Sequence, residues 1–288
     1  MEIQKNKNLR KRTVLILVLF LALCFIVRKP VSYLIHGYRV QVLDLERDGK
    51  RICGRLYLPE TEEQLPAVIL SHGFNANMEA VERYAEIFAE NGIAAYIFDF
   101  IGGGTRIRSD GTTKEMSVLT ERMDLETVLE SIRSDSHIQK DQIFLMGTSL
   151  GGFVSVMTAA RHPKDIAGLI LLYPAFQLQK DFERRIADPE RYPTKGELMG
   201  TPISEMFVND LLSFDIYQTM KKYRGRVLII HGTKDPIVSI PYSERAVKVF
   251  KHAELYRIEG GGHGFKGKQR KEAAEQALSF VQAVLNSQ

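Results

Sequence analysis

Three residues whose side chains could share one proton-transfer reaction occur along the chain in the order serine, aspartate, histidine. Ser149 lies in the motif GTSLG of residues 147–151, a G-x-S-x-G pattern. A serine hydroxyl is a weak nucleophile unless a neighbouring base removes its proton. Histidine commonly serves as that base, and a carboxylate that accepts a hydrogen bond from its other ring nitrogen orients it. Ser149 is therefore a candidate nucleophile whose partners should lie downstream.

The two partners that we predict are Asp235 and His263. Asp235 stands in HGTKDP, directly after the apolar run Val227–His231, and His263 stands in GGGHGF, directly after Leu255–Ile258. Both follow predicted strands, and an open α/β sheet places its active site at the carboxyl ends of its strands. We predict that His263 is the general base and Asp235 the acid that orients it. Alternatively, Asp235 is only a turn residue before Pro236, and His263 is only a structural residue of its glycine-rich loop.

The local sequence around Ser149 predicts a strand, a tight turn and a helix. Ile143–Met146 reads as a buried strand and Leu150–Arg161 as a helix. This is the setting of a nucleophile elbow, where small flanking residues allow the turn and the hydroxyl projects above the sheet. The helix N-terminus behind the serine favours developing negative charge. The alternative is that Ser149 only caps the helix.

Acyl transfer also needs backbone donors for the oxyanion. The N–H of Leu150, the residue after the serine, is the first candidate. The second should come from the loop after the predicted strand Ala67–Ser71, which reads SHGFN, and we select the N–H of Phe74. We expect His72 to shape this loop by packing and hydrogen bonding rather than to transfer protons.

The rest of the chain alternates between strand and helix patterns, which predicts a mostly parallel sheet with helices on both faces. Two early strand-like runs flank Asp48-Gly49, a turn signal that predicts a hairpin. With the runs named above, the expected sheet has eight strands. The further predicted strands are Tyr38–Asp44, Arg51–Leu58, Ile93–Phe98 and Ile166–Leu172, and the further helices are Met78–Glu90, Met116–Ser134 and Arg270–Leu285.

One segment interrupts this alternation. About fifty residues separate Tyr173 from Val227, more than a simple crossover requires. We predict a small cap inserted at about 175–225, with a helical patch at Ser204–Leu212. Apolar cap side chains could form an acyl pocket or could simply pack the cap on the body. The candidate substrate-binding residues are Phe176, Met206, Phe207 and Leu211.

The N-terminal residues 13–27 read TVLILVLFLALCFIV, an uncharged run that would span about 22 Å as a helix. Five basic residues precede the run and two follow it, and nothing near its end resembles a small-residue cleavage site. We predict an uncleaved signal anchor over 1–35 in the cell membrane, with a catalytic domain over 36–288 outside the cytoplasm. The alternatives are a cleaved signal peptide with secretion, and a buried helix.

Composition excludes several other classes. The chain has 288 residues, 44% of them hydrophobic, enough for one catalytic domain. Its net charge of +4 is concentrated at the N-terminus and the rest of the chain is close to neutral, so the composition does not indicate a basic surface for nucleic acid. Two cysteines imply no disulfide framework, and Cys53 reads as a small buried residue. Neither glycine cluster, at 102–104 or at 260–262, fits a nucleotide motif, and no histidine spacing suits a metal. We predict no cofactor and no metal.

Together the motifs SHGFNAN, GTSLGG, HGTKDPIV and GGGHGF resemble the α/β-hydrolase superfamily. The greatest likeness is to bacterial cinnamoyl/feruloyl esterases and related carboxylesterases, over about residues 40–285. The resemblance implies the α/β-hydrolase fold, a cap inserted after the sixth strand that helps to bind an aromatic acyl group, and no cofactor.

From these motifs we predict a serine hydrolase that cleaves carboxylic esters through an acyl-enzyme intermediate. Its partner would be a small-molecule ester of an aromatic or short-chain acid. A serine peptidase of the prolyl-oligopeptidase type, an acyltransferase and a thioesterase remain open, because each would use the same triad. A binding protein without catalysis is disfavoured because all three triad residues are present.

Overall fold

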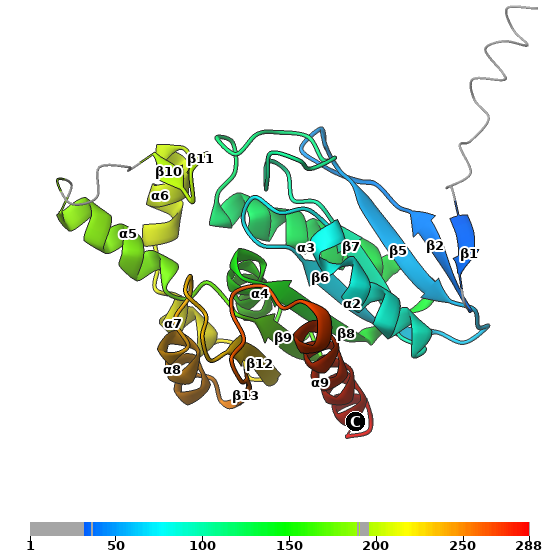
Figure 1. The fold of residues 1–288 in the computed structure, drawn as a ribbon. Helices are drawn as coiled ribbons and strands as arrows, with labels where there is room; N and C mark the ends of the chain where they lie inside the picture. Colours follow the sequence, from blue (N-terminus) through cyan, green and yellow to red (C-terminus); the bar gives the residue numbers. More distant parts are fainter. Residues whose placement is uncertain (1–31, 36, 189, 191–195, 288) are drawn as a thin grey trace, which may run out of the picture. The chain divides into compact units, whose positions relative to one another are not determined.

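The computed structural model describes residues 32–35, 37–188, 190 and 196–287, and its central element is a nine-stranded sheet (Figure 1). In spatial order the strands are β1 (Ser32–Ile35), β2 (Tyr38–Val42), β5 (Gly54–Pro59), β7 (Ala94–Phe98), β6 (Leu65–Ser71), β8 (Ile138–Thr148), β9 (Gly168–Leu172), β12 (Arg226–Gly232) and β13 (His252–Ile258). From β7 to β13 neighbouring strands run parallel, whereas β1, β2 and β5 pair antiparallel. The sheet is thus mostly parallel, as predicted.

The eight predicted strands are present, and β1 is an additional edge strand. Its residues are the last four of the segment that we predicted as an anchor, and they pair with β2. The predicted hairpin is also present, since β3 (Leu45–Arg47) and β4 (Lys50–Ile52) pair around Asp48-Gly49. Both turn residues have positive φ, 52° and 75°, the conformation for which aspartate and glycine are favoured in such turns.

Helices cover both faces of the sheet. Alternate residues of a strand point to opposite faces, and because both sets are apolar here, both faces need to be covered. Ala67 and Ile69 of β6 belong to one core cluster, and Val68 and Leu70 to the other. The first cluster packs under α3 (Val118–Ser134), α4 (Leu150–Arg161) and α8 (Pro241–Val249). The second packs under α2 (Glu79–Glu90) and α9 (Gly267–Leu285). All but α8 were predicted, and Cys53 is buried as expected.

Between β9 and β12 the chain forms the elements α5 (Leu178–Ala187), β10 (Glu197–Leu198), β11 (Thr201–Pro202), α6 (Glu205–Leu212) and α7 (Ile216–Met220). In Figure 1, α5, α6 and the β10–β11 pair lie beyond the end of the sheet, while α7 lies beside α8. We call residues 175–225 the cap. Side-chain hydrogen bonds join it to the body, from Asn75 to Thr201 (2.8 Å) and from Thr113 to the Pro202 carbonyl (2.7 Å).

The apolar run of residues 13–27, which we predicted as a membrane anchor, lies outside the described residues. Among the residues that the structure does describe, no helix combines the length and the apolar character needed to cross a membrane.

Candidate active site

The turn that carries Ser149 connects β8 directly to α4, as an elbow does. Ser149 has a φ of +50° and a ψ of −116°, a strained conformation for a residue with a side chain. The flanking glycines are required sterically. A Cβ on Gly147 would lie 2.3 Å from the Gly151 carbonyl oxygen, and a Cβ on Gly151 would lie 2.4 Å from the His72 carbonyl oxygen. The G-x-S-x-G pattern therefore follows from close backbone packing around the serine.

Ser149, His263 and Asp235 are joined in one hydrogen-bonded line. Ser149 Oγ lies 3.1 Å from His263 Nε2, and His263 Nδ1 lies 2.8 Å from Asp235 Oδ2. An ionised carboxylate only accepts, so the Nδ1–H of His263 donates to Asp235 and leaves Nε2 free to accept the serine proton. The three residues come from the loops after β8, β12 and β13, at the carboxyl ends of parallel strands.

The carboxylate of Asp235 is fully buried and closely held. Its Oδ1 accepts the N–H groups of Ile237 and Val238, each at 2.9 Å, and its side chain has no exposed surface. Burial alone would raise the pKa of Asp235. Hydrogen bonds with His231 and His263 and the two backbone donors outweigh burial and hold the pKa of Asp235 well below its usual range. The side chain is therefore a carboxylate at neutral pH, ready to stabilise an imidazolium on His263.

His231 is a supporting residue that the sequence analysis did not single out. It is the penultimate residue of β12 and is completely buried. Its Nε2 lies 2.9 Å from the Val238 carbonyl and 3.3 Å from Asp235 Oδ2, and its Nδ1 lies 2.7 Å from Ser243 Oγ. The signal available in the sequence was a histidine at the end of the predicted strand Val227–His231, four residues before Asp235.

The predicted oxyanion donors lie beside the nucleophile. No hydrogen bond joins the N–H of Phe74 or of Leu150 to an acceptor among the described residues, so both groups are free to bind a ligand oxygen. The loop that carries Phe74 passes close to the serine, since a Cβ on Gly73 would lie 3.1 Å from Ser149 Cβ. An oxyanion site requires such unpaired donors near the nucleophile, so the prediction for Phe74 and Leu150 is compatible with these contacts.

His72 lies beneath this loop and shapes it, as expected. Its ring is completely buried, with Nδ1 2.8 Å from the Gly73 carbonyl, and Nε2 accepts the Phe100 N–H at 3.2 Å. Burial lowers the pKa of His72, and the neutral ring satisfies both bonds. Neither ring nitrogen bonds to a triad residue.

Asn75 ties three segments together and was also missed by the sequence analysis. Its side-chain oxygen accepts from the N–H (2.8 Å) and the hydroxyl (3.0 Å) of Thr105, and its amide nitrogen donates to Thr201 in the cap. Asn75 adopts a φ of +52°, which asparagine tolerates better than most residues. The residue after Phe74, the predicted oxyanion donor, is thus fixed to both the 102–111 loop and the cap.

The four predicted substrate-binding residues differ in their burial and in the side chains that they contact. Phe207 contacts the loop that carries Phe74, which we call the oxyanion loop after its predicted role: its ring is 6.2 Å from that of Phe74 and 5.9 Å from that of Phe182. Phe176, Phe207 and Leu211 are all buried in the core cluster. Met206 differs, because 38% of its surface is exposed on the outside of α6.

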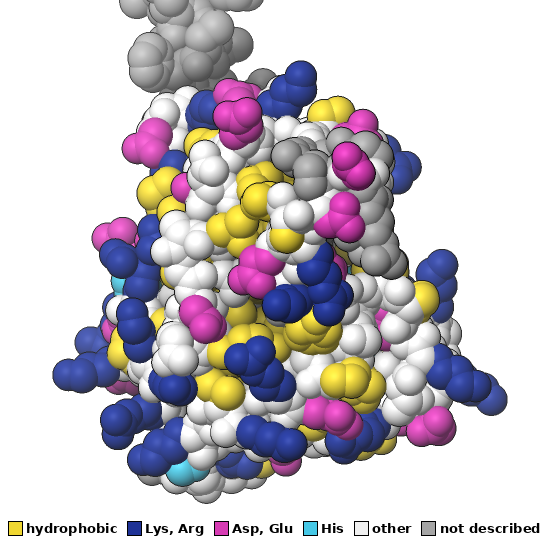
Figure 2. Space-filling model, turned by 90° about the vertical axis from the view of Figure 1, so that its left-hand side faces the viewer, with side chains coloured by type: hydrophobic (Ala, Val, Ile, Leu, Met, Phe, Trp, Pro, Cys, Tyr) yellow, Lys and Arg dark blue, Asp and Glu magenta, His cyan; other side chains and the backbone are white. Residues whose placement is uncertain are grey.

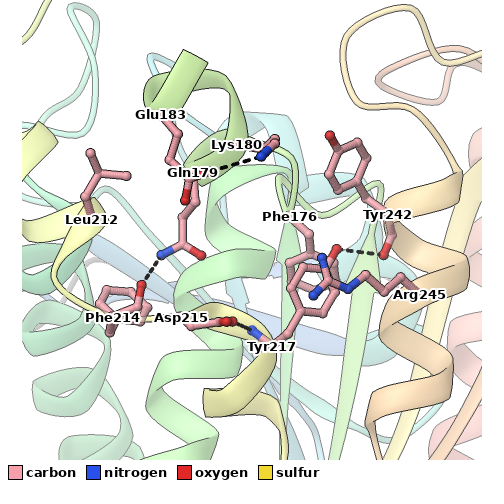
Figure 3. A pocket seen from close by; sticks show the side chains of 10 residues that line it. All are labelled: Phe176, Gln179, Lys180, Glu183, Leu212, Phe214, Asp215, Tyr217, Tyr242 and Arg245. Carbon is pink, nitrogen blue, oxygen red and sulfur yellow. Dashed lines mark hydrogen bonds and ion pairs between the residues drawn. The ribbon is translucent and has the colours of Figure 1, made fainter. Parts of the chain in front are cut away.

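Phe176 also lines a groove of about 550 Å³ between α5, α7 and α8 (Figure 3). Its other walls include Gln179, Tyr217 and Arg245, and the Arg245 guanidinium stands 3.8 Å from the centre of the Tyr217 ring. No triad residue lines this groove. Outside this groove, Arg108 in the loop after β7 pairs with Glu79 at 2.6 Å.

Exposed apolar side chains occur on the face that carries the cap. Figure 2 shows hydrophobic side chains gathered near the middle of this face, among basic and acidic groups. Of the five large hydrophobic residues that are exposed in the described chain, four belong to the cap or to the loop after β12: Ile186, Met199, Met206 and Ile237.

The sheet order, the elbow and the Ser–His–Asp line define an α/β hydrolase of the serine-hydrolase class. Comparison with known proteins agrees. The family model described as "serine aminopeptidase, S33" matches residues 62–208, about half of the chain, and the chain belongs to this family.

Individual relatives are distant. Monoacylglycerol lipase ABHD6 of Mus musculus is 20% identical over 268 residues, which cover 77% of this chain and 77% of that protein. Hydrolase acrC of Aspergillus aculeatus is 27% identical over 150 residues, 48% of this chain but only 32% of that protein. Among solved structures, Est1E from Butyrivibrio proteoclasticus with bound ferulic acid has a TM-score of 0.71 and 22% identity, covering 85% of this chain and 98% of that one.

Proposed function

We propose that this protein hydrolyses carboxylic esters through an acyl-enzyme intermediate on Ser149. The observation that carries the proposal is the continuous line of hydrogen bonds from Ser149 Oγ through the His263 ring to the buried carboxylate of Asp235. This arrangement supplies a nucleophile, a base with its acceptor nitrogen turned to the nucleophile, and a charge that stabilises the base once it is protonated.

In the first half-reaction, Ser149 Oγ attacks the ester carbonyl while His263 Nε2 accepts the hydroxyl proton. The N–H groups of Phe74 and Leu150 donate to the oxyanion that forms. The intermediate collapses as the C–O bond to the alcohol breaks, and His263 gives its proton to the departing oxygen. In the second half-reaction, His263 Nε2 takes a proton from water, which attacks the acyl carbon. The bond from that carbon to Ser149 Oγ then breaks, His263 returns the proton to Oγ, and the acid is released.

The substrates that we favour are esters with an apolar acid part. Two relatives support this choice by name, since one is a monoacylglycerol lipase and one solved structure holds ferulic acid. The aromatic contact of Phe207 with Phe74 brings apolar cap surface next to the oxyanion loop. We propose Phe176, Phe207 and Leu211 as the apolar lining on the acyl side, with Met206 near its outer rim.

A peptidase is the second candidate, because the family model is described as a serine aminopeptidase. The same triad can attack an amide, but the leaving amine then needs the proton of His263 far more than an alkoxide does. Activity on activated esters alone would therefore not distinguish the two functions. Peptide-like substrates have to be measured beside the esters.

The test is a substrate panel with the full chain in detergent micelles. It holds p-nitrophenyl acetate, butyrate and octanoate, methyl ferulate, and the p-nitroanilides of alanine and proline, with Ser149→Ala as the control. Hydrolysis of the esters that disappears in Ser149→Ala is the expected result. Anilide hydrolysis with kcat/KM equal to that of the unactivated methyl ester would favour the peptidase. Equal ester hydrolysis by Ser149→Ala would refute the proposed nucleophile.

We also propose that residues 13–27 anchor the catalytic domain, 36–288, to the outside of the cell membrane. The uncharged run and the basic residues before it support this proposal. Fractionation of cells tests it, with an intact N-terminus in the membrane pellet as the expected result. An intact N-terminus in the soluble fraction would refute it.

A further inference from the structure

Gln177 links the first residues of the cap to the loop that carries the acid. It is the residue immediately before α5, and its side chain reaches across to the segment after Asp235. Its amide nitrogen donates to the Ile237 carbonyl at 3.1 Å and to Asp181 Oδ2 at 2.8 Å, and its amide oxygen accepts the Ser239 N–H at 3.0 Å. One side chain thus binds two peptide groups of a loop about sixty residues away.

The bonded segment is the one that holds the Asp235 carboxylate. The N–H groups of Ile237 and Val238 both donate to Asp235 Oδ1, while the Val238 carbonyl lies 2.9 Å from His231 Nε2. The Ser239 carbonyl accepts the Tyr242 N–H at 3.2 Å. Gln177 holds the two remaining polar groups, the carbonyl of Ile237 and the N–H of Ser239. Every backbone polar group from 237 to 239 therefore has a defined partner.

This segment has few other restraints on its outer side. The Ile237 side chain is 41% exposed and Ser239 is also exposed, so packing fixes only Val238, which is 5% exposed. His231 holds the segment from inside the sheet, and Gln177 holds it from the cap. Because the Ile237 and Val238 N–H groups orient the acid, a displacement of the segment is transmitted to the Asp235–His263 bond.

We propose that Gln177 is a positioning residue for the triad, which fixes the orientation of Asp235 through residues 237–239 and thereby makes the attachment of the cap a determinant of turnover. This inference rests on the proposed function, in which Asp235 orients His263. The charged and titratable groups around the linkage are Asp181 on α5, His231 on β12, and His263 and Tyr173, whose rings are 4.7 Å apart beside the acid.

Gln179, two residues further along, provides a matched control. Its side chain also binds backbone groups, but those of the cap itself: it donates to the carbonyls of Leu211 and Phe214 and accepts the Ile216 N–H. Figure 3 shows Gln179 turned toward Phe214, on the α7 side of the groove. A methionine at either position keeps the length of the side chain and removes its hydrogen bonds.

The experiment compares Gln177→Met with Gln179→Met in the full chain. We expect kcat for p-nitrophenyl butyrate to fall about tenfold in Gln177→Met with KM unchanged, because substrate contacts are intact while the base is misaligned. The far-downfield proton resonance of the His263 Nδ1–H should broaden or move in the same variant. In Gln179→Met both the kcat and the resonance should match wild type, even if its melting temperature falls as far.

Wild-type kcat and an unmoved resonance in folded Gln177→Met would overturn the inference, and so would equal changes in Gln179→Met. If Gln177→Met does not fold, Gln177→Glu keeps the acceptor for Ser239, loses the donor to Ile237 and Asp181, and places a carboxylate beside that of Asp181. The same reduced kcat is expected. The resonance needs no substrate. A wild-type protein that hydrolyses no ester would therefore refute the proposed function and still allow the role of Gln177 to be measured.

Discussion

A methyl group placed on Gly73 should impair turnover more than folding. Gly73 precedes Phe74, the proposed oxyanion donor, and its φ is not in the left-handed region, so alanine is acceptable to the backbone. The added Cβ would lie 3.1 Å from Ser149 Cβ, 3.4 Å from the Thr148 carbonyl oxygen and 3.7 Å from Ser149 Oγ. Carbon atoms in contact prefer about 3.5–4.0 Å. The loop and the serine must therefore separate by about half an ångström.

That displacement would move two reacting groups relative to each other: the Ser149 nucleophile and the Phe74 N–H, the proposed donor to the oxyanion. Misplacement by about 1 Å can lower the rate about a hundredfold. Half of that displacement, with half the increase in activation free energy, predicts a kcat about tenfold lower in Gly73→Ala. Overpacking costs about 1–3 kcal/mol of folding free energy, which leaves most domains folded at 25 °C. The loss should therefore appear in kcat per folded enzyme.

The assay measures kcat for p-nitrophenyl butyrate, normalised by titration of Ser149 with a fluorophosphonate, beside a urea unfolding curve. Gly262→Ala is the matched control. Gly262 adjoins His263, but a methyl group added there would have no neighbouring atom within 4 Å, and its φ is not positive. Its kcat should stay close to that of wild type. A normal kcat in Gly73→Ala would refute the argument that the Phe74 loop lies against Ser149 during catalysis.

Three further predictions concern the groups around the triad. Asp235→Asn keeps the shape of the acid but not its charge, and should lower kcat for p-nitrophenyl butyrate about 10⁴-fold; a loss below tenfold would exclude the proposed role. Asn75→Gly removes the bonds to Thr105 and Thr201 without backbone strain, and should lower kcat with little change in melting temperature. Glu121 is buried, and burial and then Asp124 raise its pKa well above the usual value. Folded protein therefore keeps a proton that unfolded chain releases, and stability falls as pH rises above the ordinary glutamate pKa; urea unfolding at pH 5 and pH 8 should show a smaller fall in Glu121→Gln.

Most of the sheet and the triad geometry could be predicted because the signals are local. Buried parallel strands read as short apolar runs, and the predicted helix Leu150–Arg161 has the bounds of α4. Ser149, Asp235 and His263 each follow such a run directly, so the topology of the sheet brings them together. The strand β1 was missed because its residues follow the apolar N-terminal run and were grouped with it. The helix α8 was missed although Pro241 at its first position was a usable start signal.

The supporting contacts could not be predicted, because they join side chains to backbone groups far apart in the sequence. Asn75 and Thr201 are 126 residues apart, and Gln177 and Ile237 are 60 apart. Neither pair belongs to a periodic pattern, and nothing in the local sequence distinguishes Gln177, a half-buried glutamine before a helix, from other glutamines. The cap's apolar residues were likewise ambiguous, since a buried phenylalanine such as Phe207 has the same pattern whether it packs the cap or lines a site.

These contacts divide the site into a part that the sheet fixes and a part that depends on the cap. Ser149 is held by the turn between β8 and α4, where the Ser149 N–H donates to the Leu172 carbonyl at 2.9 Å, deep in the body. The oxyanion loop and the acid loop are instead tied to the cap, through Asn75 and Gln177 respectively. A shift of the cap should therefore change how well the oxyanion and the imidazolium are stabilised while the nucleophile stays in position. It follows that cap variants that break or displace the contacts of Asn75 or Gln177 should alter kcat even where they touch no substrate, whereas cap variants that leave both contacts in place should not.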